Sequence, residues 1–182
     1  MHITKRILFL GMLAAFATAE AKVTLPALFS NNMVLQQKSD VALHGRSSAK
    51  KDVTITVGWN KQIYTAPTDT QGNWKIEIPT PSAGGPYEIT LSDGEEQVLK
   101  NIMIGEIWLY AGEVNAGMPI EGASQSSIRL FQVKKEISLV PKEDLDPAQG
   151  EWQECSTEVV AGFPTEGYFF ASQLQKTLKV PI

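Results

Sequence analysis

The run Ile102-Met103-Ile104-Gly105-Glu106-Ile107-Trp108-Leu109-Tyr110 divides this sequence into two halves with different patterns. It is almost continuously apolar, and Glu106 is the one carboxylate inside it. Such a run is typical of a strand that is covered on both faces, because a strand with one face in water alternates apolar and polar residues. We therefore predict a buried strand here and a change of architecture at this point.

The half before this run has the pattern of an all-β sandwich. Short apolar or β-branched stretches alternate with turn signals such as Gln71-Gly72-Asn73, Ala83-Gly84-Gly85-Pro86 and Ser92-Asp93-Gly94. Strands are expected at residues 41–45, 53–57, 62–66, 74–78 and 87–91. We place a β-sandwich domain at residues 22–103.

The half after the run predicts a mixed α/β arrangement. A polar loop is expected at 111–127, a strand at 128–133, a charged connection at 134–150 and a short strand at 151–154. Residues 164–179 are predicted to form a helix that Pro181 stops, with one broad apolar face made by Tyr168, Phe169, Ala171, Leu174 and Leu178. We assign 104–182 to the first strands and helix of an incomplete α/β domain, which would next receive a parallel strand. The predicted fold class is thus mainly β.

The first 21 residues have the anatomy of a secretory signal peptide. Basic Lys5 and Arg6 precede an apolar run from Ile7 to Ala19, and Ala19-Glu20-Ala21 supplies small residues at a cleavage site. The run is too short for a membrane span, which needs about 20 residues. We expect cleavage after Ala21 and a secreted or periplasmic product.

Charge and cysteine content exclude several classes of function. Without the leader the chain keeps 14 basic and 19 acidic residues, a net charge of about −5, which argues against a nucleic-acid partner. Cys155 is the single cysteine, so neither an intramolecular disulfide nor a four-cysteine zinc site can form. His44 is the one histidine after the leader, and a lone histidine does not make a zinc site. We expect no metal and no cofactor.

Several blocks of this sequence, in the same order, are similar to those of a known family. They are 28–37 (LFSNNMVLQQ), 84–87 (GGPY), 105–109 (GEIWL), 151–155 (EWQEC) and 168–170 (YFF). The chain resembles the bacterial sialate O-acetylesterases, secreted esterases of the SGNH (GDSL-like) hydrolase group with an N-terminal β-sandwich. The resemblance implies an SGNH-type α/β domain after the sandwich, and a substrate that is an O-acetylated sialic acid or related glycan. It covers about a third of a full family member.

The resemblance also locates the position of the catalytic nucleophile, which this chain lacks. The family's turn reads Gly-Gln-Ser-Asn-Met, and here it is Gly112-Glu113-Val114-Asn115-Ala116. Gly112 and Asn115 match, but the isopropyl group of Val114 has no lone pair with which to attack a carbonyl. The family's later oxyanion donors and its Asp-x-x-His pair have no counterparts before Ile182. We therefore predict that the chain as given is not catalytically competent.

No other group of residues in the sequence replaces the missing triad. His44 lies mid-strand without a Ser or Asp context and is read as a partly exposed strand residue. Cys155 is read as a small buried hydrophobe. Glu113 and Glu121 flank the turn and are read as solvated loop carboxylates, although a glycosidase-type acid/base pair is an alternative. Glu106, inside an apolar run, is expected to have a hydrogen-bonded structural role, since burying it unpaired costs several kcal/mol.

The sandwich aromatics allow either core packing or sugar stacking. We favour core positions for Trp74 and Tyr87, leave Tyr64 open, and consider Trp59 the best candidate for an exposed ligand contact. Three interpretations of the whole chain remain. The first is the N-terminal piece of a sialate O-acetylesterase-like protein with its serine lost. The second is a noncatalytic β-sandwich module for glycan binding or domain packing. The third is a truncated product that needs a missing C-terminal part to cover its apolar surface.

Overall fold

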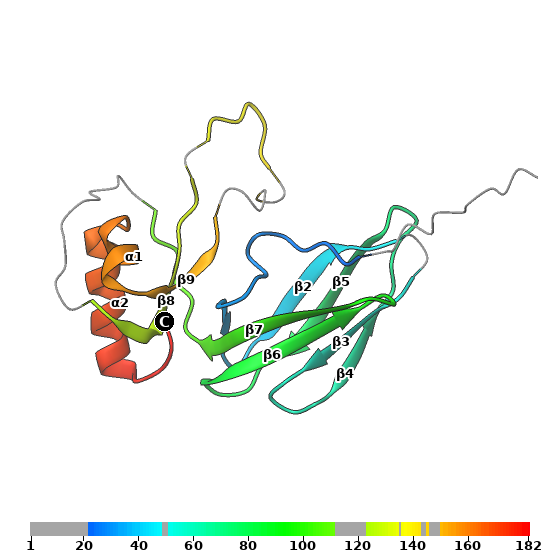
Figure 1. The fold of residues 1–182 in the computed structure, drawn as a ribbon, viewed down its shortest axis with the longest axis horizontal. Helices are drawn as coiled ribbons and strands as arrows, with labels where there is room; N and C mark the ends of the chain where they lie inside the picture. Colours follow the sequence, from blue (N-terminus) through cyan, green and yellow to red (C-terminus); the bar gives the residue numbers. More distant parts are fainter. Residues whose placement is uncertain (1–21, 49–50, 112–122, 135, 143–144, 146–149) are drawn as a thin grey trace, which may run out of the picture.

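The computed structural model describes residues 22–48, 51–111, 123–134, 136–142, 145 and 150–182. The predicted leader, the turn with Gly112, Val114 and Asn115, and the carboxylates Glu113 and Glu121 lie outside these ranges. Two lobes stand side by side in Figure 1: a sheet-rich sandwich lobe that ends with β7, and a second lobe built from β8, β9, α1 and α2. The chain is mainly β, as predicted.

The sandwich lobe contains a five-stranded sheet in the order β1-β7-β6-β3-β4. β1 pairs with β7 in parallel, and the other neighbours are antiparallel. β1 was not predicted. The strands of this sheet are β1 (Val34–Gln36), β3 (Val53–Val57), β4 (Ile63–Ala66), β6 (Gly84–Ser92) and β7 (Glu96–Gly105).

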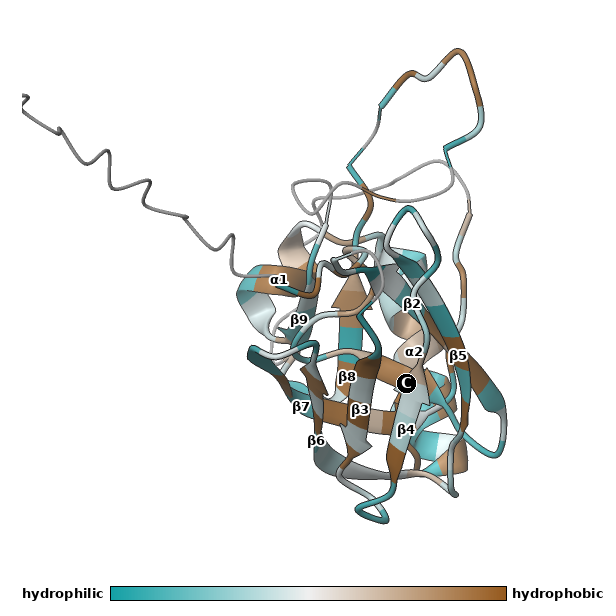
Figure 2. Ribbon diagram, turned by 90° about the vertical axis from the view of Figure 1, so that its right-hand side faces the viewer, coloured by the Kyte–Doolittle hydropathy of each residue, from teal (hydrophilic) through white to brown (hydrophobic). Residues whose placement is uncertain are grey.

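A two-stranded sheet completes the sandwich. β2 (Asp40–Arg46) runs antiparallel to β5 (Asn73–Pro79), and each residue of β2 is paired with one of β5, from Asp40 with Pro79 to Arg46 with Asn73. Side chains from both sheets meet in one core, and apolar residues alternate along the strands in Figure 2, as the pleat requires. All five predicted strands are confirmed. Fully buried members of this core include Met33, Val53, Ile55, Ile78, Ile89, Leu91 and Ile102.

Two of the three predicted turns are confirmed. The Asp69 carboxylate accepts hydrogen bonds from the N–H groups of Gln71 and Asn73, both at 2.8 Å, and Gly72 has φ 85°. Gly94 turns the β6–β7 hairpin with φ 124°. The third prediction is partly correct: Gly84–Pro86 belongs to β6 rather than to a turn, but Gly85 has the expected positive φ, 125°. At Gly85 a Cβ would lie 2.8 Å from the carbonyl oxygen of Ile102, so this glycine permits an irregular, close pairing with β7.

The predicted strand at 102–110 is only partly correct. Its first residues belong to β7, which ends at Gly105, opposite Gln36 at the end of β1. Beyond that point no strand among the described residues pairs with the chain, and the side chains of Trp108 and Leu109 are 57% and 91% exposed. The apolar pattern of residues 107–110 is therefore not matched by burial. The boundary predicted at residue 103 falls inside β7 and stays a prediction.

The second lobe packs two helices against a small sheet. β8 (Gln125–Phe131) and β9 (Trp152–Cys155) are antiparallel, and α1 (Thr157–Ala161) and α2 (Thr165–Leu178) follow. α1 was not predicted; its N-cap is Ser156, whose hydroxyl accepts from the N–H of Val159 at 3.3 Å. Within the described part of the chain, no helix has the length and apolar character of a membrane span. The lobe's core consists of Ala123, Ile128, Leu130, Cys155, Val160, Tyr168, Ala171 and Ile182.

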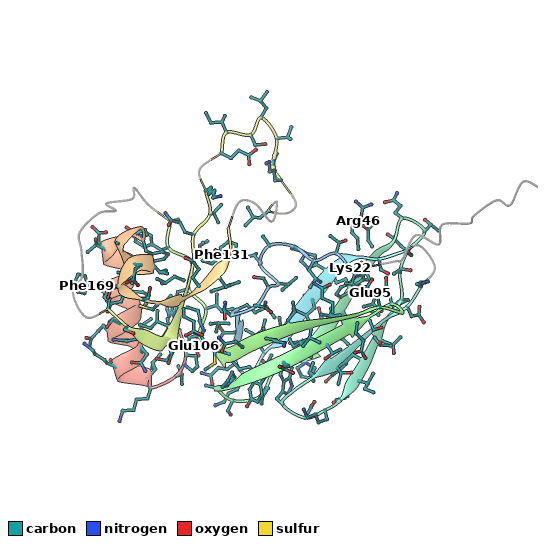
Figure 3. The ribbon with its side chains drawn as sticks, in the orientation of Figure 1. Lys22, Arg46, Glu95, Glu106, Phe131 and Phe169 are labelled. Carbon is teal, nitrogen blue, oxygen red and sulfur yellow. The ribbon has the colours of Figure 1, made fainter. Side chains whose placement is uncertain are left out.

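The predicted helix is confirmed as α2, but its buried face differs from the predicted one. Phe169 and Leu178 are 57% and 46% exposed, and Figure 3 shows Phe169 on the outer side of the lobe. Gly167, Tyr168, Ala171 and Ser172 are buried instead. The buried stripe is rotated from the predicted one, and at its Gly167 a Cβ would lie 3.1 Å from the ring of Phe163.

Candidate functional site

The segment that leads toward the predicted nucleophile turn lies at the junction of the two lobes. It begins at Glu106, directly after β7, and Figure 3 shows this residue between the sandwich and the second lobe. The turn itself, with Val114 at the nucleophile position and the matching Gly112 and Asn115, lies outside the described residues. The roles of these three residues stay predictions.

Glu106 is held by two glutamines from the end of β1 and the turn after it. Its carboxylate oxygens accept hydrogen bonds from the side-chain amides of Gln36 at 2.9 Å and Gln37 at 2.7 Å. The Gln36 side-chain oxygen in turn accepts the backbone N–H of Ile107 at 3.0 Å. This confirms the expected hydrogen-bonded, structural role of Glu106: the glutamines fix the chain where it leaves the sandwich.

These bonds also decide the protonation state of Glu106. The amide donors of Gln36 and Gln37, helped by the positive charge of Lys38, hold the pKa of the carboxyl group below its ordinary value. The group is therefore ionised at neutral pH and is a poor general acid. The Glu106 carboxylate is therefore suited to anchoring the backbone after β7 rather than to donating a proton.

A largely apolar cavity of about 380 Å³ lies between this segment and the second lobe. On one side are Glu106 to Tyr110, and on the other are Arg129 and Leu130 of β8. The rings of Trp108 and Phe170 meet edge to face, with centroids 5.1 Å apart. The remaining residues that line the cavity are Val34, Trp152, Phe163, Glu166, Gly167, Ala171 and Ile182.

A polar network beside this cavity ties the lobes together. The buried guanidinium of Arg129 contacts the Glu154 carboxylate at 3.1 Å and donates to the Asn101 side-chain oxygen at 3.0 Å. Asn101 donates to Glu154 at 2.5 Å and to the side-chain oxygen of Asn32 at 2.7 Å. Asn32 donates to the backbone oxygen of Trp152 at 3.3 Å. No pattern in the sequence predicts this network, since its members are far apart along the chain.

His44 and Cys155 do not form a catalytic pair. His44 is exposed on β2, and its ring packs edge to face on Phe29 with centroids 5.1 Å apart. Cys155 is buried on β9 in the other lobe, where desolvation raises the pKa of its thiol. Both positions agree with the roles predicted from sequence, and neither side chain provides a nucleophile with a base beside it.

The sandwich aromatics pack inward. Trp74 is buried in the core, as predicted, and Tyr87 and Tyr64 are half-buried against it. Trp59 is half-buried too, and its ring meets Tyr87 edge to face with centroids 5.9 Å apart. Trp59 is thus partly covered by the core and by Tyr87, and its role as an exposed ligand contact stays a prediction.

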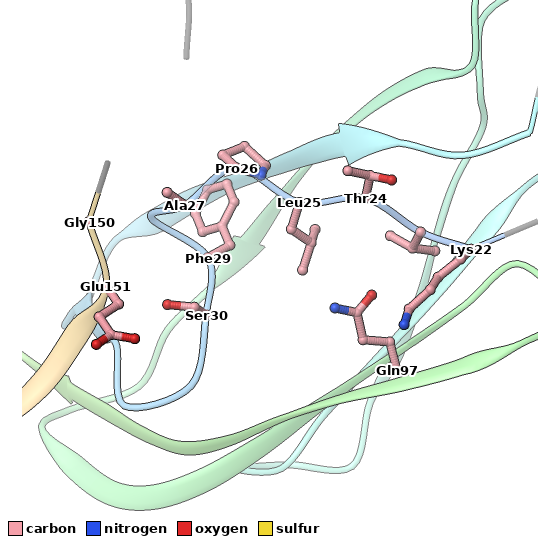
Figure 4. A pocket seen from close by; sticks show the side chains of 11 residues that line it. Lys22, Thr24, Leu25, Pro26, Ala27, Phe29, Ser30, Gln97, Gly150 and Glu151 are labelled. Atoms are coloured by element: carbon pink, nitrogen blue, oxygen red, sulfur yellow. The ribbon is translucent and has the colours of Figure 1, made fainter. Parts of the chain in front are cut away.

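A second, open cavity of about 340 Å³ lies under the N-terminal segment of the sandwich (Figure 4). Figure 4 shows Ser30 and Glu151 at one end and Gln97 and Lys22 at the other. The side-chain oxygens of Ser30 and Gln97 are buried and have no hydrogen-bond partner among the described residues. Within the same residues, no group of three or more His, Cys, Asp or Glu side chains is placed to bind a metal ion.

Comparison with known proteins adds one informative likeness. No family model matches the chain, and no curated protein matches it significantly. Among solved structures, the chain is similar to the crystal structure of a carbohydrate acetylesterase from Xanthomonas citri, with a TM-score of 0.80 and 30% sequence identity. The match covers 88% of this chain and 39% of that protein. The chain thus spans about two fifths of the length of the protein it resembles.

Proposed function

We propose that this chain is part of a carbohydrate acetylesterase, an enzyme that hydrolyses acetyl esters on glycans. The observation that carries the proposal is the likeness to the Xanthomonas citri acetylesterase, because it extends over both lobes and 88% of the chain. A fold alone does not determine an activity. Sequence identity of 30% over that length, together with the resemblance found from sequence, supports the common esterase origin.

Within this class, an O-acetylated sialic acid is the substrate we infer. The support is the ordered set of sequence blocks shared with sialate O-acetylesterases, such as residues 28–37 and 105–109. The leader at residues 1–21 supports a secreted or periplasmic location, where such glycans are met. The substrate and the location are both proposals that rest on sequence.

We further infer that the chain as given does not turn over substrate. Acetyl-ester hydrolysis of this type needs a nucleophile, a base that accepts its proton and donors for the oxyanion. Val114 stands at the nucleophile position, and His44, the one histidine outside the leader, packs on Phe29 in the sandwich. The described residues thus contain no histidine close to the segment that leads to Val114.

The test is acetate release by the purified chain from Lys22 onward. An O-acetylated sialic acid and a generic aryl acetate are the two substrates, and a heat-denatured sample is the control. We expect no release above the control from folded protein. Release that depends on folding would show an unrecognised nucleophile and would contradict the inferred inactivity. Preference for the sialic acid would then support the substrate proposal.

Restoring the serine alone should not restore activity. We expect Val114→Ser to release acetate no faster than the unaltered chain, because the base and the remaining oxyanion donors are still absent. Both proteins are assayed at equal concentration, with circular dichroism to show equal folding. Clear acetylesterase activity in Val114→Ser would contradict this view of the missing groups.

A noncatalytic module for domain packing is the second candidate function. It is favoured by the exposed apolar side chains at the lobe junction, where Trp108, Leu109 and Phe170 are 57%, 91% and 47% exposed. Glycan binding through the sandwich aromatics is less favoured, since Trp59 packs on Tyr87. Calorimetric binding of an O-acetylated glycan without acetate release would favour a glycan-binding module over domain packing.

A further inference from the structure

The open cavity of the sandwich lies apart from the cavity at the lobe junction and shares no lining residue with it. Residues 22–30 cover this open cavity (Figure 4). Near one end of the cover, Thr24 exchanges two backbone hydrogen bonds with Arg46 of β2, at 2.7 and 2.9 Å. Near the other end, the carbonyl of Leu28 accepts the indole N–H of Trp152 on β9 at 2.9 Å. The cover is held at both ends, so the cavity is preformed, as small-molecule sites usually are.

Gln97, which lines this cavity, is a polar residue in an apolar row of β7. Side chains alternate along a strand, so Gln97 points to the same face of the sheet as Leu99, which is 5% exposed in the sandwich core. Its partner on β6 is Leu91, another core residue. The side-chain oxygen of Gln97 is buried and has no hydrogen-bond partner among the described residues. An unbonded buried acceptor lowers stability, and an apolar side chain at this position would avoid that loss.

The hydroxyl of Ser30 is a second unbonded polar group on the same cavity. Its oxygen is buried and has no hydrogen-bond partner among the described residues. Figure 4 shows Ser30 at the end of the cavity opposite to Gln97. Buried polar groups of folded proteins nearly always have a hydrogen-bond partner. Two unbonded groups at the two ends of one cavity therefore indicate a ligand with polar groups at both of its edges.

The wall between these two ends is apolar. Val23, Leu25 and Phe29 line it, and all three pack on the sandwich core. The volume of about 340 Å³ is near the lower end of the range of small-molecule sites, which is roughly 300 to 1,000 Å³. The cavity thus has room for a small ligand with an apolar face.

The charged side chains at the cavity do not favour a strongly charged ligand. Figure 4 shows Lys22 beside Gln97 at one end and Glu151 beside Ser30 at the other. Because the two charges are opposite, they cancel for a ligand that spans the cavity. The ligand that fits is uncharged, apolar on its faces and rich in groups that donate and accept hydrogen bonds at its edges.

We propose that this cavity binds one pyranose ring of a neutral glycan. A pyranose ring has apolar C–H faces, which lie against Leu25 and Phe29. Its edge hydroxyls both donate and accept, so they supply the donor for the Gln97 oxygen and a partner for the Ser30 hydroxyl. Lys22 beside Gln97 is exposed, and exposed side chains change rotamer within nanoseconds, so it can swing aside as the ring enters. The inference concerns binding alone and does not depend on the proposed ester hydrolysis.

The test is binding of two neutral sugars, galactose and N-acetylglucosamine, to the full chain. NMR titration follows the side-chain amide of Gln97 and the backbone amide of Ser30, and at least one sugar should shift both signals to saturation. Gln97→Leu should weaken that binding at least about tenfold and raise the melting temperature by about 3 °C, because it removes an unbonded buried acceptor. Gln173→Leu makes the same chemical change on the exposed side of α2 and is the control, which should alter neither quantity. Ser30→Ala should also weaken binding without lowering the melting temperature.

Several results would overturn the proposal. No saturable shift with either sugar would mean that ordered water or nothing fills the cavity. Cyclohexanol that binds as tightly as the sugars would show a plain apolar cavity without recognition of hydroxyl groups. Sugar binding that is unchanged in both Gln97→Leu and Ser30→Ala would place the sugar elsewhere on the chain. If Gln97→Leu does not fold, Ser30→Ala decides alone. None of these readouts uses acetate release, so a failure here is distinct from a failure of the proposed function.

Discussion

The two lobes of this chain bury their apolar residues to very different extents. In the sandwich lobe, Val53, Ile55 and Ile89 are 0% exposed between two sheets. In the second lobe, the small β8–β9 sheet and two helices leave Leu109, on the adjoining segment, 91% exposed. Both halves of the sequence are rich in apolar residues, so composition does not explain the difference. The difference lies in the number of strands available to pair and cover those residues.

Connectivity explains much of this contrast. In the sandwich, β3–β4 and β6–β7 are hairpins of consecutive strands, whose turns are short and whose pairing is local. In the second lobe, β8 and β9 are joined by the long connection from residue 132 to 151. The pairing of the second lobe is therefore non-local, and its sheet has two strands among the described residues.

The largest expected effect is the loss of core packing in the sandwich. Ile89→Ala removes three carbon atoms from a fully buried position and should lower the free energy of unfolding by about 4 kcal/mol. Ile63→Ala on β4, where the side chain is 65% exposed, is the matched control and should change it by less than about 0.5 kcal/mol. Urea unfolding measures both. Similar losses in the two variants would contradict the difference in burial between Ile89 and Ile63 within the sandwich.

A smaller loss of stability is expected for a substitution where the two lobes meet. In Gly105→Ala the new Cβ would lie 2.0 Å from the carbonyl oxygen of Pro181, so residues 181–182 must move away from β7. We expect a loss of about 3 kcal/mol and faster proteolysis after Lys179. Gly162→Ala is the control, since its Cβ would meet nothing closer than 3.8 Å. If Gly105→Ala is as stable as Gly162→Ala, the close approach of Gly105 to the carbonyl of Pro181 is contradicted.

The buried Arg129 allows the stability contribution of a buried ion pair to be compared with that of an exposed one. Glu154→Ala leaves the Arg129 guanidinium, whose side chain is 3% exposed, without its carboxylate. Because Glu154 itself is half-exposed, we expect a loss of about 2 kcal/mol rather than the full cost of an unpaired buried charge. Glu136→Ala breaks the exposed pair with Lys142 and should cost less than about 1 kcal/mol. Thermal unfolding of both variants at low and high salt measures the two losses of stability.

The smallest effect concerns the pH dependence of stability at the junction. The amides of Gln36 and Gln37 lower the pKa of Glu106 in the folded state below its ordinary 4.5. Its stabilisation is therefore present above about pH 4.5 and is lost as the pH falls through the lowered pKa. Glu106→Gln should be less stable than the unaltered chain at pH 7, and the difference should shrink as the pH falls below 4.5. Glu95→Gln, on the exposed β6–β7 turn, is the control. A difference that persists at low pH would contradict the proposed carboxylate role.

The sequence predicted the sandwich well because its signals are local. Alternating residues such as Val53 to Val57, and turn residues such as Gly94, depend on near neighbours only. The same reasoning misplaced Phe169 and the strand beyond Gly105, since burial there depends on contacts between segments that are far apart along the chain. For the candidate site, the hydrogen-bonded role of Glu106 was predicted. The partners Gln36 and Gln37 were not, because they are about 70 residues away.

Amide hydrogen exchange over the whole chain is the measurement that best tests the difference between the two lobes. The account predicts that the N–H groups of β3, β6 and β7 exchange only through global unfolding. Those of β8 and β9 should exchange through smaller, local openings, and those of residues 108–110 should exchange almost freely. Equal protection of the amides in both lobes would contradict the claim that the sandwich buries its apolar residues more completely than the second lobe. The protection should be the same in diluted samples, so that self-association does not cause it.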